Sequence, residues 1–149
     1  MAKKDAAALW GQRKAKWQLA VALRDADNAF GAHATAYRAW DEIQRSAIER
    51  FGNFQRAKED AEAGKVIEAE WGALDDAETA WFNEYVHPAD LAAIELMLTP
   101  APDLEAVLLK ATIAKDHELD NTFSMPREPM DVILEDVQRL DLSRPIASA

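Results

Sequence analysis

The chain has 149 residues, of which 49% are hydrophobic and 30% are charged, and its formal net charge is −10. This composition excludes a disordered chain, and the length suits one domain with a buried core. The negative charge opposes binding to phosphate backbones or anionic lipid, and the absence of cysteine excludes disulfides, thiolate metal ligands and cysteine nucleophiles.

Aromatic and aliphatic residues recur at steps of mostly three and four over the first fifty residues, which predicts a long amphipathic helix. The repeat starts with Trp10 and Trp17 and continues to Phe51. Gly31 lies inside it, where a glycine costs about 1 kcal/mol relative to alanine. The pattern predicts either one helix over residues 5–51 or two nearly collinear helices.

A second long repeat predicts a helical hairpin. Turn signals at Gly52 and Gly64 place the connection between these two glycines. The apolar residues beyond it are spaced by four and three, with Glu78 as the one polar intruder: Ile67, Trp71, Leu74, Trp81 and Tyr85. We expect this helix to end at His87-Pro88, because proline disfavours a helical conformation at the residue before it. Two long helices with a short connection pack antiparallel, so the hairpin spans about 5–87.

Three shorter helices are expected after the hairpin, over about 89–98, 103–119 and 130–140. The segment Thr99–Asp103 separates the first two, since its prolines suit a first helical turn and Asp103 favours the positive end of a helix dipole. No segment shows the period-two alternation of a strand. The expected fold is all-α, a long antiparallel helical hairpin plus a cluster of shorter C-terminal helices, in a single domain over residues 1–149.

Two segments carry a resemblance. Residues 98–107 (LTPAPDLEAV), with Lys110 shortly after, and residues 136–140 (DVQRL) are similar to segments of uncharacterised small helical proteins encoded in bacterial and prophage genomes. The shared residues mark a helix boundary. The resemblance therefore implies a genomic setting and assigns no role to any residue.

Glu84 and His87 have the spacing closest to a known chemical motif. A Glu and a His at i and i+3 share a helix face, and two such pairs with two further glutamates form the di-iron site of ferritin-like bundles. Neither His33 nor His117 has a glutamate three residues before it. A histidine at a helix end often simply contacts the last carbonyls. We therefore expect no cofactor, and keep a metal-binding carboxylate/histidine bundle as an alternative.

Trp10 and Trp17 are the candidate interaction residues. Basic residues lie between them, an arrangement that can stack on bases and pair with phosphates. The net charge opposes this, so nucleic acid is not the expected partner. A first helix of about 45 residues outreaches a second of about 30. The apolar surface near these tryptophans must then be covered by the C-terminal helices or by another chain.

Charge is unevenly distributed along the chain. The residues up to Arg24 include six basic and one acidic residue, whereas residues 59–84 include nine acidic residues and one lysine. This asymmetry fits either internal complementarity between antiparallel helices or a surface that faces a partner.

No pattern in the chain predicts catalysis, because nucleophile-elbow and phosphate-loop motifs are absent from the sequence. No apolar run approaches the roughly 18 residues of a membrane span, and the N-terminus lacks the apolar stretch of a signal peptide. We expect a cytoplasmic, non-enzymatic helical module for protein–protein interaction or assembly, and a homo-oligomer. The second alternative is an acidic regulator of a nucleic-acid-associated partner.

Overall fold

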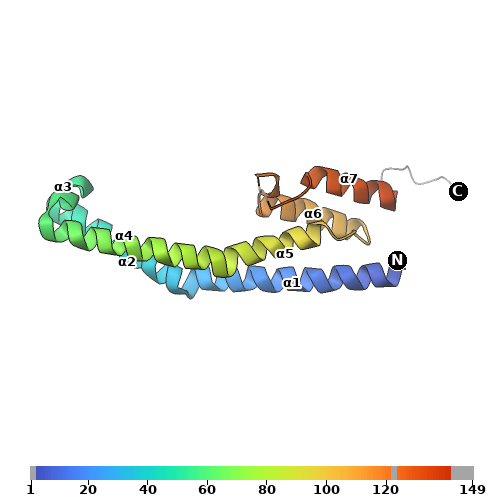
Figure 1. Ribbon diagram of the computed structural model, residues 1–149, viewed down its shortest axis with the longest axis horizontal. Coiled ribbons are helices and arrows are strands. Elements are labelled where there is room, and N and C mark those ends of the chain that lie inside the picture. The colour runs from blue at the N-terminus through green and yellow to red at the C-terminus, as the bar shows by residue number, and fades with distance from the viewer. Residues whose placement is uncertain (1–2, 122–123, 142–149) are drawn as a thin grey trace. The chain divides into compact units, whose positions relative to one another are not determined.

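The computed structural model describes residues 3–121 and 124–141, and the regular structure of these residues is helical throughout (Figure 1). The chain forms two compact units. Unit 1 comprises Met1–Ala20 and Pro88–Ala149, and unit 2 comprises Val21–His87. The predicted all-α fold, an antiparallel hairpin followed by shorter helices, is confirmed. That residues 1–149 act as one domain stays a prediction.

Unit 2 contains the hairpin. Helix α1 (Lys3–Phe30) ends in this unit, and Gly31 separates it from α2 (Ala32–Phe51), so the predicted stretch forms two helices and not one. A short helix α3 (Phe54–Glu59) then leads into α4 (Ala61–Trp81). The connection between the two long helices therefore lies inside the predicted interval.

Local capping explains where these helices begin and end. Gly52 closes α2 with a φ of 85°, a left-handed conformation that favours glycine, and its N–H donates to the carbonyl of Ile48 at 2.9 Å. The side chain of Asn53 accepts a hydrogen bond from the N–H of Arg56 at 2.8 Å. Asp60 caps α4 in the same way. The chain thus turns twice within a few residues, at Gly52 and at Asp60.

The helix does not end at His87-Pro88, in contrast to the prediction. Helix α4 passes into a π-helical turn, η1 (Phe82–Val86), and α5 (His87–Met97) follows directly. In the wider turn the N–H of His87 donates to the carbonyl of Phe82, five residues back. The hydrogen-bond ladder changes register here, and Pro88 lies in the first turn of α5, where its missing N–H is tolerated.

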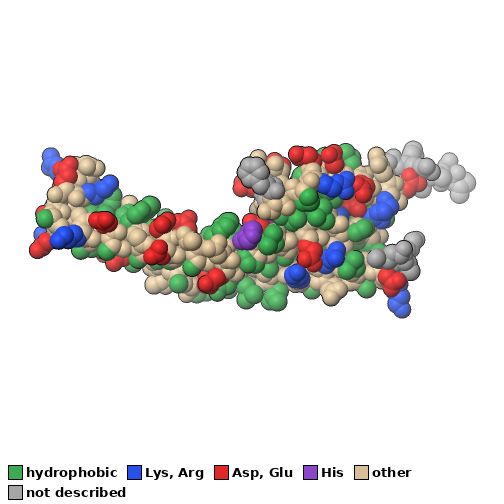
Figure 2. Space-filling view, viewed as in Figure 1, with side chains coloured by type: hydrophobic (Ala, Val, Ile, Leu, Met, Phe, Trp, Pro, Cys, Tyr) green, Lys and Arg blue, Asp and Glu red, His purple; other side chains and the backbone are tan. Residues whose placement is uncertain are grey.

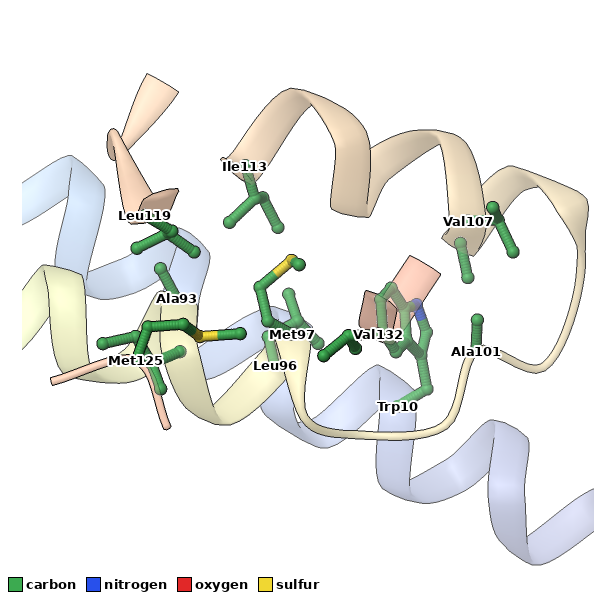
Figure 3. Packing of buried hydrophobic residues seen from close by; sticks show 12 residues of the cluster. Trp10, Ala93, Leu96, Met97, Ala101, Val107, Ile113, Leu119, Met125 and Val132 are labelled. Atoms are coloured by element: carbon green, nitrogen blue, oxygen red, sulfur yellow. The ribbon is translucent and has the colours of Figure 1, made fainter. Parts of the chain in front are cut away.

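Unit 1 has a core built by α5, α6 (Leu104–Asp116), α7 (Pro129–Leu140), the connecting segments and the first part of α1 (Figure 3). Asp103 caps α6, since its side chain accepts from the N–H of Ala106 at 2.9 Å. Helix α6 ends at Asp116, earlier than predicted, and a 3-10 turn follows over Leu119–Asn121. Trp10 of α1 belongs to this core.

A buried ion pair joins α6 to α7. The side chain of Lys110 is 1% exposed, and its Nζ donates to Oδ2 of Asp136. The other carboxylate oxygen accepts from the N–H of Ala101 at 3.1 Å and from Arg139 at 2.8 Å. Burial lowers the pKa of Lys110 below its ordinary value, and the hydrogen bond and charge of Asp136 act in the opposite direction. The buried charge of each side chain is therefore compensated by the charge of the other.

We expect Asp136→Asn to lower the free energy of unfolding by about 3–5 kcal/mol, because it leaves the Lys110 ammonium unpaired in the core. The double variant Lys110→Met with Asp136→Asn should lose much less, since it buries no uncompensated charge and its amide oxygen can still accept from the N–H of Ala101. Urea unfolding followed by circular dichroism measures both values. A single variant as stable as the wild type would contradict this account.

Candidate interaction surface

The buried core of unit 2 is one seam between two helices. Helices α2 and α4 lie side by side (Figure 1), and the seam is completed by one residue of α3. Its buried members are Trp40, Ala47, Ala57, Ile67 and Leu74. Trp40 and Ala47 on α2, and Ile67 and Leu74 on α4, are each seven residues apart, which brings them to one face of each helix, as the heptad-like pattern predicts. A hairpin of this kind covers each long helix along one side.

A cavity of about 620 Å³ opens beside this seam, near the turn of the hairpin. Three aromatic rings line it. Trp40 is 8% exposed and lies 5.1 Å from Trp71 and 5.9 Å from Phe54 between ring centroids. Trp71 is 55% exposed although it contacts Trp40. One tryptophan thus belongs to the core, and the other presents most of its indole to solvent.

Polar groups complete the lining of the cavity. Gln44, Lys58 and Glu68 line it together with the aromatic rings. Nζ of Lys58 lies 5.5 Å from the ring centroid of Phe54, a cation–π contact. Gly64 is required by close packing, because a Cβ there would lie 2.6 Å from the carbonyl oxygen of Lys58. The glycine lets the first turn of α4 pack against the end of α3, which forms one wall.

Further apolar side chains of the hairpin face solvent. Each of the following is about half exposed: Tyr37, Ile48, Val66, Trp71 and Phe82. On the face shown in Figure 2, hydrophobic and acidic side chains are interspersed along the hairpin, and several basic side chains lie toward its α3 end. Single exposed hydrophobic residues are ordinary, but a series of large ones along both helices of a two-helix core indicates an interaction surface.

Charge divides the hairpin into two parts. Residues 45–66, around the turn, include five basic and four acidic residues. Residues 67–87, on the returning helix, include six acidic residues and no lysine or arginine. The cavity lies where these two parts meet, since Lys58 belongs to the first and Glu68 to the second.

Trp10 and Trp17 lie in unit 1 and are largely covered there. Trp10 is 7% exposed in the core, and Trp17 packs against that core. The indole N–H of Trp17 donates to Nε2 of His117 at 3.0 Å, while Nδ1 of His117 lies 2.8 Å from a carboxylate oxygen of Asp90. The sequence predicts that the apolar surface near Trp10 is covered either by the C-terminal helices or by another chain. In the structure, the helices of unit 1 bury Trp10 within the chain.

Glu84 and His87 do not form a ligand cluster in the structure. Glu84 lies in the π-helical turn η1, and the ring of His87 stacks on Phe82 with centroids 5.9 Å apart. Within residues 3–121 and 124–141, no group of three or more His, Asp or Glu side chains has an arrangement that could hold a metal ion. The metal-binding alternative therefore gains no support from the geometry.

The aromatic cavity is the feature that sequence reasoning missed. The spacing of Trp40 and Trp71 assigns both to a helical seam and does not separate a buried from an exposed tryptophan. A usable signal was Gly64, four residues after Asp60, which marks a close approach of backbone segments next to the aromatic residues.

Comparison of the chain with protein-family models, with curated proteins and with solved structures found no significant match. Among the helices that the structure describes, none has both the length and the apolar character needed to cross a membrane.

We expect Trp40→Ala to destabilise unit 2 by about 3–5 kcal/mol, because it leaves a cavity in the seam. Trp71→Ala should cost about 1 kcal/mol, since most of its indole is exposed in the monomer. Native-state hydrogen exchange of the α2 and α4 amides, at a concentration low enough to hold the chain monomeric, measures both effects. Equal losses would show that the two tryptophans do not differ in the way the exposures indicate.

Proposed function

We propose that this chain is a non-enzymatic helical assembly module that self-associates through the hairpin of α2 and α4. The observation that carries the proposal is the small core of unit 2. It is a single seam of buried residues between α2 and α4, and large apolar side chains of the hairpin remain exposed. Antiparallel hairpins of this form are half of a four-helix bundle, in which each helix is covered on two sides. A second copy supplies the missing layer.

Two polar atoms of the hairpin are buried without a hydrogen-bond partner. The rings of His33 and Trp81 stack with centroids 4.7 Å apart. Nδ1 of His33 and Nε1 of Trp81 are buried and have no hydrogen-bond partner among the residues described. A buried unsatisfied donor or acceptor costs about 1–3 kcal/mol. Because both atoms are buried within the chain itself, a second copy could bond to them only after the two rings rearrange.

A second candidate is an acidic surface that binds a basic protein partner, for which residues 67–87 supply six acidic residues. The two candidates differ in their dependence on salt. Association driven by apolar burial persists at high ionic strength, whereas binding of a basic partner to an acidic helix weakens as the Debye length shortens. Self-association is favoured because the exposed side chains of the hairpin include large aromatic ones.

We expect the wild-type chain to form a concentration-dependent dimer by native mass spectrometry and light scattering, and Trp71→Glu to shift it to monomer, because a charge would be buried in the interface. Leu104→Glu is a matched control, since Leu104 is similarly exposed, at 52%, but lies on α6 of unit 1. A monomeric wild type at high concentration would end the proposal. Dissociation by Leu104→Glu and not by Trp71→Glu would move the interface to unit 1.

A further inference from the structure

We propose that the aromatic cavity of unit 2 is the reciprocal anchor of this dimer: Trp71 of each copy inserts into the cavity of the other, and Lys58 of one copy pairs with Glu68 of the other. This inference rests on the proposed self-association and names its contacts. It is carried by a cavity, an exposed tryptophan and two opposite charges in one small region.

The cavity has a size that suits an indole ring. A volume of about 620 Å³ lies within the roughly 300–1,000 Å³ of sites that hold small organic groups, so an aromatic side chain can enter. The aromatic walls of the cavity are the rings of Trp40, Phe54 and the chain's own Trp71, and aromatic rings favour offset or edge-to-face contacts with another ring. Trp71 is therefore both a wall of its own cavity and the side chain that enters the cavity of the other copy. Tryptophan in such a pocket is the residue type that most often dominates an interface energetically.

Two charged side chains of the cavity lining, Lys58 and Glu68, are available to pair with a second copy. Among the ion pairs of the described residues, none includes Lys58 or Glu68, although both line the cavity. In an interface with two-fold symmetry the same patch faces itself, so a patch with one cation and one anion forms two equivalent pairs. The lining of this cavity has that composition.

The charge of α4 favours this arrangement over a simpler one. Helix α4 carries six acidic residues and one lysine, so contact of α4 with α4 of a second copy would bring like charges together. Lys58 belongs to α3, next to the turn. A contact that places α3 of one copy over α4 of the other sets a cation against an anion and avoids the repulsion.

Charge reversal with complementary mixing tests the contact. We expect Lys58→Glu alone and Glu68→Lys alone each to weaken the dimer at least about tenfold, because each sets like charges together twice across the two-fold axis. An equimolar mixture of the two variants should form a heterodimer with near wild-type affinity, since every pair is again opposite in sign. If Lys58 and Glu68 paired only within one chain, mixing the variants would restore no ion pair, because each variant carries two like charges at these two positions.

Sedimentation velocity with one fluorescently labelled variant measures the mixture, and circular dichroism checks that each variant is folded. Lys65→Glu and Asp76→Lys reverse the same charges outside the cavity lining and should leave the dimer unchanged. A wild-type monomer would remove the self-association itself. If the wild type is a dimer but the single variants still dimerise normally, or if their mixture forms no heterodimer, the reciprocal anchor is wrong. Neither result would contradict the proposed assembly module itself.

Discussion

The architecture of unit 2 follows from the single apolar seam between α2 and α4. A helix in a two-helix hairpin can bury one stripe of side chains, and any further apolar residue on its surface stays in water. The seam buries Trp40, Ile67 and Leu74, whereas Trp71 and Val66 on the same helix α4 remain about half exposed. The hairpin thus carries more apolar surface than one partner helix can cover, and this excess is the physical basis of the proposed assembly.

Unit 1 buries part of its apolar surface within the chain. Its three short helices and the first part of α1 pack around one cluster that includes Trp10 and Leu96, while Leu104, Leu108 and Met130 remain exposed. The ion pair of Lys110 with Asp136 then fixes the register of α6 against α7, because a buried charge tolerates few alternative positions. The buried pairing gives both Lys110 and Asp136 a structural role in unit 1.

Periodicity and turn chemistry were sufficient to predict the fold class and the interval of the hairpin turn, because both depend on residues close in sequence. The chain stays helical through Pro88 because the hydrogen-bond register changes in η1, and no local residue pattern predicts that change. Trp10 and Trp71 show the limit most clearly. Both occupy apolar positions of amphipathic helices, yet one is 7% and the other 55% exposed. The difference lies in how many helices surround each, which is a property of the tertiary structure.

In the proposed dimer, the acidic stretch on α4 makes the contact between the two copies selective. A strongly negative helix repels a second copy unless the contact includes cations, and most cations of the hairpin lie around its turn. Like-charge repulsion along residues 67–87 then disfavours registers in which α4 helices overlap, while the pairing of Lys58 with Glu68 favours one register near the turn. In the proposed arrangement apolar burial supplies the affinity, and the distribution of charge determines the geometry of the dimer.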